Sequence, residues 1–260
     1  VVVAGLLLLA FLLVRVGLAH FQREELLGHE IDVLNLRWGW GVFCRSFRGE
    51  AKGIFDWYQI SIGGSLKNLG YPMIIMVVLA IAGIFIGLHL TKVFPFSLGE
   101  VSPENWKDPV QSSLEMWPLL AKQNFLAFLG NNIRFMFLSL IAGMLSLGIL
   151  GVLPTMATLA VTAYLVGTLS AVGLPGWQIF IGFILPHGWL EIGAGLLSSA
   201  VILRGGARLA SPGEKKTIGE VFISSIADWF KIFVGLVLPA LILAAVIEVW
   251  ITPWIAARML

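Results

Sequence analysis

Long apolar runs alternate with shorter polar stretches along this chain of 260 residues. A helix needs about 20 consecutive apolar residues to cross a bilayer. The runs do not alternate residue by residue as the strands of a membrane barrel would. We therefore predict an all-α polytopic transmembrane bundle of about six spans. The six stretches are Val1–Ala19, Tyr71–Leu90, Arg134–Leu153, Met156–Leu174, Trp177–Leu203 and Ile232–Trp250.

Three regions follow from this pattern. Residues 1–19 form an N-terminal span, residues 20–70 a cytoplasmic or interfacial amphipathic segment, and residues 71–260 a membrane core of five spans. Very short turns near Pro154 and Pro175 separate consecutive spans within the core.

The composition supports the membrane assignment and excludes several classes of protein. Hydrophobic residues make up 58% of the chain and charged residues 12%, against roughly 25% charged in soluble domains. The net charge of +2 gives no indication of nucleic-acid binding. The single cysteine, Cys44, excludes an internal disulfide and a cysteine-based zinc site.

The placement of basic residues predicts the orientation. The polar segments 20–70 and 204–231 hold 11 of the 17 Lys and Arg residues. Alternating spans put these two segments on one face, and basic loops are retained on the cytoplasmic side. We expect a multi-pass protein of the cell membrane with both segments in the cytoplasm.

Three polar segments have an amphipathic pattern. Aromatic and basic residues alternate through 37–57, which predicts a region lying in the interface or, alternatively, a helix packed on the cytoplasmic ends of the spans. We expect Val110–Gln123 to form a surface helix on the outer face. Thr217–Phe230 should form a third amphipathic helix that leads into the last span.

The most distinctive stretch is Pro186-His187-Gly188-Trp189-Leu190-Glu191, which has apolar sequence on both sides. Ionisable groups at membrane depth are costly and usually functional. His187 and Glu191 are four residues apart and share one face of a helix. Pro186 should kink or break the helix, and Gly188 permits close backbone approach. One interpretation is a polar site facing the bundle interior; the other is a buried hydrogen-bonded pair that fixes helix packing.

A second polar group, Asn131-Asn132-Ile133-Arg134, opens the predicted span Arg134–Leu153. The tandem amides can cap a helix or form hydrogen bonds to another helix. Arg134 can extend to the outer interface, or pair with a carboxylate such as Glu191.

Glycines are frequent in the predicted spans, where small residues allow helices to approach closely. We expect tight helix packing at these positions, or self-association through the first two. They are Gly83, Gly87, Gly143, Gly148, Gly193 and Gly195.

No hydrolase or nucleotide-binding motif is visible, and the four histidines do not cluster by spacing. We therefore predict a protein that is not an enzyme and has no catalytic residue, metal site or cofactor. The expected partners are the lipid bilayer and other membrane subunits or further copies of the chain.

From these residues the chain resembles the stage II sporulation protein M family. The resemblance covers Tyr71–Ile255 and depends on the Asn131–Arg134 group, the Pro186-His187-Gly188 element with Glu191, and the Arg204-Gly205-Gly206 exit. It implies a core of about five spans with a cytoplasmic N-terminal side. Sporulating members act with peptidoglycan-degrading partners during engulfment, but the resemblance implies no catalytic residue.

Two departures from the family pattern argue against a sporulation-specific role. The turn after the Asn-Asn span reads Leu153-Pro154-Thr155-Met156 instead of containing Asn-Gly, and Val1–Ala19 precedes the core. The leading hypothesis is a non-catalytic multi-pass scaffold or accessory subunit of a larger membrane complex. The alternative is a small permease or channel that uses the polar site between Pro186 and Glu191. An intramembrane hydrolase is a third, weaker hypothesis.

Overall fold

The computed structural model describes residues 11, 15, 36–95, 106–212 and 216–259. Every regular element in this part of the chain is helical. The predicted span Val1–Ala19 lies outside the described residues apart from Phe11 and Arg15, so its prediction remains open.

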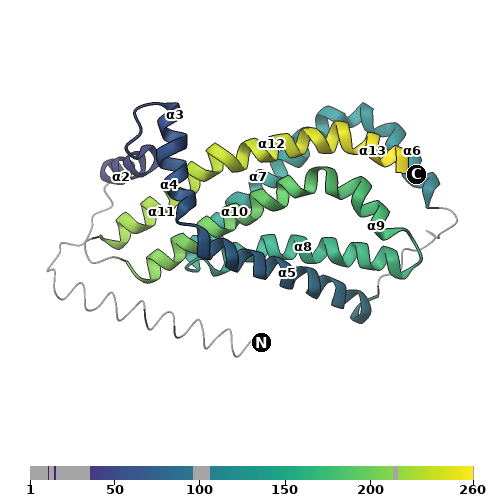
Figure 1. Ribbon diagram of the computed structural model, residues 1–260, viewed down its shortest axis with the longest axis horizontal. Coiled ribbons are helices and arrows are strands. Elements are labelled where there is room, and N and C mark those ends of the chain that lie inside the picture. The colour runs from purple at the N-terminus through teal and green to yellow at the C-terminus, as the bar shows by residue number, and fades with distance from the viewer. Residues whose placement is uncertain (1–10, 12–14, 16–35, 96–105, 213–215, 260) are drawn as a thin grey trace.

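Five helices are long and apolar enough to cross a membrane. Three are single α-helices, α5 (Gly70–Val93), α7 (Ala121–Leu145) and α8 (Ile149–Ala171). The fourth and fifth, Gly176–Ala210 and Ile218–Met259, are each built from several helical segments. The prediction of an all-α polytopic bundle is confirmed, and the five spans run along the long axis of the molecule (Figure 1).

The fourth spanning helix joins α9 (Gly176–Ile179), the π-helical segment η3 (Phe180–Ile184) and α10 (Leu185–Ala210). The fifth joins α11 (Ile218–Ile232), η4 (Phe233–Val237), α12 (Leu238–Val246), η5 (Ile247–Ile251) and α13 (Thr252–Met259). At 1.5 Å per residue the fifth helix is about 63 Å long, roughly twice the thickness of a bilayer core. Part of this helix therefore lies outside the hydrocarbon.

Each π-helical segment in these two helices ends two residues before a proline: Pro186, Pro239 and Pro253. A proline ring clashes with the carbonyl four residues earlier and cannot donate a hydrogen bond. The wider π turn relieves this conflict, because the residue before the proline donates to the carbonyl five residues back. Leu185 N–H, for example, donates to Phe180 O.

Pro186 therefore bends the helix without ending it, and the bend between α9 and α10 is visible in Figure 1. The kink predicted from the sequence is present. The alternative of two half-helices with a non-helical break is not, because the helix is continuous from Gly176 to Ala210.

The predicted turn at Pro154 is wrong. Pro154 lies inside α8, and the turn between α7 and α8 comes earlier, at Ser146–Gly148. Leu147 and Gly148 have φ of 54° and 93°, and Gly148 N–H donates to Gly143 O over 2.6 Å. A Cβ on Gly148 would lie 3.0 Å from Leu203 Cα, so this turn is fixed by α10 as well as by backbone conformation.

Helix α5 packs along α8 through small residues. A Cβ on Gly83 would lie 2.7 Å from Met156 O, and one on Gly87 would clash with the Ala160 backbone. Two glycines offered as a self-association surface are therefore covered by α8 of the same chain. The opposite side of α5 exposes large apolar residues to the bilayer, including Ile74, Val78 and Phe85.

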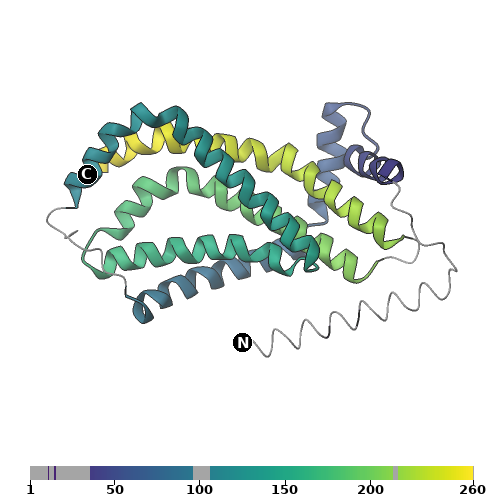
Figure 2. The same cartoon turned by 180° about the vertical axis from the view of Figure 1, so that it is seen from behind.

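One end of the molecule carries α2 (Leu36–Arg48), α3 (Ile54–Asp56), η1 (Trp57–Ile62) and α4 (Gly63–Lys67) beside α11 (Figures 1 and 2). We call this the α11 end. The Phe43 ring lies edge-on to Phe230 at 5.8 Å, which holds α2 against α11. Of the two interpretations of the 37–57 region, packing on the span ends is therefore realised.

The opposite end carries α9, α13, α6 (Lys107–Met116) and the 3₁₀ segment η2 (Trp117–Leu120), and we call it the α9 end. The predicted Val110–Gln123 helix is not a single helix, because α6 ends at Met116, η2 follows it and α7 begins at Ala121. Trp117 Nε1 in η2 donates to Val249 O over 3.1 Å and attaches this stretch to the fifth spanning helix. The predicted Thr217–Phe230 helix is present, as α11. Its capping box at Thr217 and Glu220 fixes the first turn.

Candidate functional site

A polar cluster near the α9 end surrounds His187, which lies in the first turn of α10 and is buried. Its Nδ1 is 3.2 Å from Thr252 Oγ1, and its Nε2 is 3.8 Å from Glu248 Oε1. Both partners belong to the fifth spanning helix, at η5 and the start of α13. The imidazole therefore links the fourth and fifth helices at the level where both contain a π turn.

The π turns position these side chains. A π turn adds a residue to the helical repeat and so rotates the side chains that follow it. His187 follows η3, Glu248 lies within η5, and Thr252 N–H closes that segment by donating to Ile247 O. The two prolines that require these turns, Pro186 and Pro253, thus set the directions of both polar faces.

Glu191, one turn beyond His187, faces a different helix. Asn132 Nδ2 of α7 donates to Glu191 Oε1 over 2.5 Å. The helix α7 begins at Ala121, so Asn131 and Asn132 lie well inside it and do not cap it. The capping interpretation is therefore wrong. Asn132 instead forms a hydrogen bond between α7 and α10.

Asn131 and Arg134 point away from this contact and are exposed. Within the part of the chain that the structure describes, no ion pair joins Arg134 to Glu191 or to another carboxylate. Of this group, Asn132 and not Arg134 is the residue that contacts Glu191.

Glu248 is the important residue that the sequence analysis left aside. In the sequence it stands near Trp250, at the end of the predicted span Ile232–Trp250. In the structure its side chain is 19% exposed and faces His187. No motif could have found it, because its role depends on the fifth helix packing against the fourth.

A cavity of about 450 Å³ reaches Glu248 and Thr252 from between α6, α8 and the two bent helices. Its other walls are mostly apolar and include Trp106, Trp117 and Phe183. The Glu248 carboxylate and the Thr252 hydroxyl thus border the cavity and contact His187, and the hydrogen-bonded pair of Glu191 and Asn132 lies one turn further along α10. Such a set can bind or relay protons or hold a small cation. The described residues contain no group of three or more His, Cys, Asp or Glu side chains in metal-binding proximity.

The polar interior continues toward the middle of the bundle as uncharged contacts. Thr155 Oγ1 and Ser199 Oγ are 2.8 Å apart across α8 and α10, and Trp229 Nε1 donates to Ser198 Oγ over 2.9 Å. Trp229 is 1% exposed and packs on Phe137 and Phe233. These contacts join α7, α8, α10 and the fifth helix without placing a charge in the centre.

The remaining glycines from the sequence analysis differ in their surroundings. A Cβ on Gly143 would clash with Ile202, and one on Gly195 would lie 3.3 Å from Thr155. Gly193 has no atom within 4 Å of that position. A Cβ on Gly188 would lie 3.3 Å from the side chain of Ile184, which belongs to the same spanning helix. Helix approach therefore explains Gly143 and Gly195 but not Gly193.

Comparison with known proteins gives one match. A family model described as "Stage II sporulation protein M" matches residues 73–253, which include all five spanning helices in whole or in part. No curated protein and no solved structure matches the chain.

Proposed function

Since the chain belongs to the stage II sporulation protein M family, we propose that it is a multi-pass accessory subunit, or scaffold, of a larger complex in the cell membrane. We place its α11 end in the cytoplasm, because segments 20–70 and 204–231 carry most of the basic residues.

Exposed apolar side chains outside the five spans carry this proposal. Leu36 and Trp40 on α2 are 75% and 67% exposed, and Ile54 and Phe55 at α3 are 80% and 82% exposed. The hydrocarbon region covers the apolar faces of the spans, but these four residues lie beyond the start of α5 at Gly70. Exposed apolar groups of this kind mark contact surfaces for other proteins or for the membrane, and we assign this surface to a protein partner.

Gentle purification from the native membrane tests this function. We expect companion proteins to co-purify, and Trp40→Ser to reduce their retention. Trp177→Ser is the matched control, because Trp177 is 68% exposed at the α9 end. Isolation as a lone monomer without companions, or equal loss in both variants, would contradict the proposal.

A small permease or channel is the second candidate, supported by the cavity that reaches Glu248, whose carboxylate faces His187. In proteoliposomes this function predicts solute or proton flux that His187→Ala and Glu191→Gln abolish. Absence of flux for protons and small cations would exclude a permease or channel that uses this polar cluster.

A further inference from the structure

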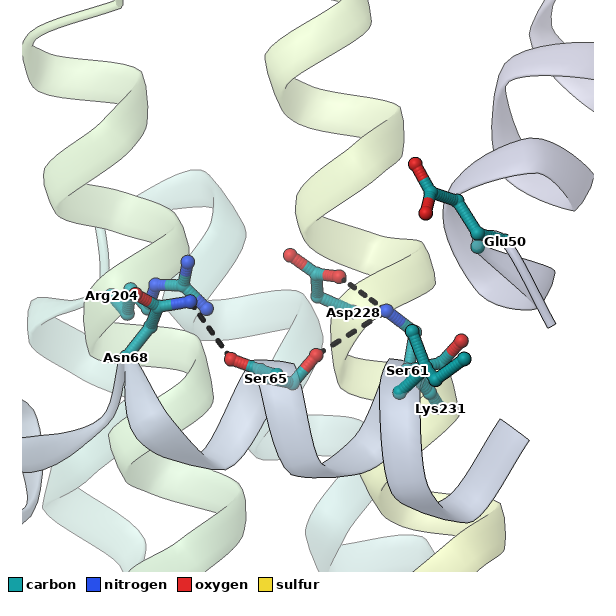
Figure 3. Close-up of a pocket in the computed structure, with 10 residues that line it drawn as sticks. Glu50, Ser61, Ser65, Asn68, Arg204, Asp228 and Lys231 are labelled. Atoms are coloured by element: carbon teal, nitrogen blue, oxygen red, sulfur yellow. Dashed lines mark hydrogen bonds and ion pairs between the residues drawn. The ribbon is translucent and has the colours of Figure 1, made fainter. Parts of the chain in front are cut away.

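A second polar cavity, of about 280 Å³, lies at the α11 end, where η1 and α4 meet α10 and α11. Figure 3 shows its polar lining, which comes from three separate parts of the chain. The residues are Ser61, Ser65, Asn68, Arg204, Asp228 and Lys231. Glu50, which is exposed, stands at the edge of the group.

Asp228, one of the two acids that line this cavity, is already neutralised by basic residues. Asp228 accepts a hydrogen bond from Arg208 over 2.9 Å and one from Lys231 over 3.0 Å. Lys231 is 5% exposed, and its ammonium also donates to Ser65 Oγ over 3.3 Å. Lys231 is therefore fixed in the cavity wall by two partners.

Arg204 is different, because its half-buried guanidinium forms no hydrogen bond or ion pair with any residue that the structure describes. It is attracted by Asp228 and repelled by Arg208. The charged residues that line the cavity are Arg204, Lys231, Asp228 and Glu50, and Arg208 beside Asp228 brings the group to three positive charges and two negative charges. A guanidinium has five N–H donors, and burying them without acceptors is unfavourable. Because Asp228 is already paired with Arg208 and Lys231, the Arg204 guanidinium is left with unused donors at the cavity.

The cavity lies at the depth of lipid headgroups. Asn68 precedes the first residue of α5 by two positions, and Arg204 is in the last two turns of α10. Helix α5 has 24 residues and a length of about 36 Å, which slightly exceeds a hydrocarbon core of about 30 Å. The end of α5 near Asn68 is therefore at the membrane surface.

We propose that this cavity binds a phosphate ester, with the Arg204 guanidinium as the main ligand and Lys231 and Asn68 at its sides. Arginine pairs with two phosphate oxygens at once, which Lys and Asn cannot do. The depth favours the phosphodiester of an anionic lipid headgroup. The nearby carboxylates of Glu50 and Asp228 favour a singly charged diester over free phosphate, which carries up to two charges near neutral pH.

Binding of short-chain phosphatidylglycerol to the full protein in neutral detergent tests the proposal. Two further ligands show which part of the lipid is bound. They are inorganic phosphate, and a diacylglycerol with the same chains but no phosphate. We expect phosphatidylglycerol to bind, diacylglycerol not to bind, and Arg204→Gln to weaken phosphatidylglycerol binding about tenfold or more, because charge-assisted hydrogen bonds are lost. Lys67→Gln is the matched control, because Lys67 is exposed on α4 outside the cavity lining.

If inorganic phosphate binds as tightly as the lipid and depends equally on Arg204, the anion site is supported with free phosphate as its source. No binding of either phosphate compound would overturn the proposal, and so would equal weakening by Arg204→Gln and Lys67→Gln. Should Arg204→Gln fail to fold, Asn68→Asp places a negative charge at an exposed position of the lining. It should weaken binding in the same direction, and unchanged binding would overturn the proposal.

Discussion

The two ends of the bundle both contain polar clusters, but they are built on different physical principles. At the α9 end, His187, Glu191 and Glu248 are joined to neutral partners or held at a distance, and acidic groups are in excess. At the α11 end, Asp228 is held by two close cations and basic groups are in excess. The α9 cluster depends on hydrogen bonds to uncharged partners at membrane depth, whereas the α11 cluster depends on ion pairs at the membrane surface.

This difference follows from the surroundings. Lipid hydrocarbon has no water to solvate a charge, so a carboxylate there needs a donor such as the Asn132 amide. Near the headgroups water solvates the excess charge, and short ion pairs can form between long side chains. The comparison implies that removing a charge is costly at the α11 end, while removing a hydrogen-bond partner is costly at the α9 end.

The largest expected effect is that of Asp228→Asn. It leaves the buried Lys231 ammonium without its ionic partner, and breaking such a pair costs about 3 kcal/mol. The measurement is the free energy of unfolding in mixed micelles. Glu115→Gln, at an exposed position on α6, is the control and should change it by less than about 0.5 kcal/mol. A small effect at Asp228 would show that the ion pairs do not hold this end together.

Asn132→Ala should have the next largest effect. It removes the donor to Glu191 and should lower the free energy of unfolding by about 1.5 kcal/mol. The neighbouring Asn131→Ala provides a close control, because Asn131 is exposed on the same helix and should be nearly neutral. Equal effects at the two positions would indicate helix propensity and not the interhelical bond.

Thr252→Val tests the contact with His187 while keeping the shape of the side chain. Thr252 is 5% exposed, and a hydrogen bond between membrane helices contributes about 0.6 kcal/mol on average. We expect a loss of that size in the same unfolding measurement. Thr158→Val on α8 is the control for losing a hydroxyl, because Thr158 is exposed and donates only to Pro154 O of its own helix; it should cost less than Thr252→Val. A gain in stability for Thr252→Val would mean that His187 does not use this hydroxyl.

The smallest expected effect comes from Glu248→Gln, which is the counterpart of Asp228→Asn at the other end. It removes the charge of one carboxylate beside His187 and breaks no hydrogen bond between residues that the structure describes. We expect the free energy of unfolding to change by less than about 0.5 kcal/mol, in either direction. A loss as large as that of Asp228→Asn would abolish the distinction between the two clusters.

The sequence by itself determined the fold class, the approximate position of each described span and the location of the Pro186–Glu191 element, because these depend on local composition. Apolar length selects spans in lipid, and proline disturbs its own helix wherever that helix packs. The ends of the helices were harder to predict from the sequence. The turn at Ser146–Gly148 is fixed by contact with α10, so the local signal at Pro154 misled the prediction.

Only the tertiary structure decided which polar groups meet. Asn132 and Glu191 are 59 positions apart in the chain, and His187 and Thr252 are 65 positions apart. Their contacts depend on the rotation of each helix, which the π turns before Pro186 and Pro253 alter. Glu248 and Arg204 acquire their surroundings in the same way. The hydropathy of a segment predicts whether it spans the membrane. The partner of a polar side chain depends instead on how the helices pack.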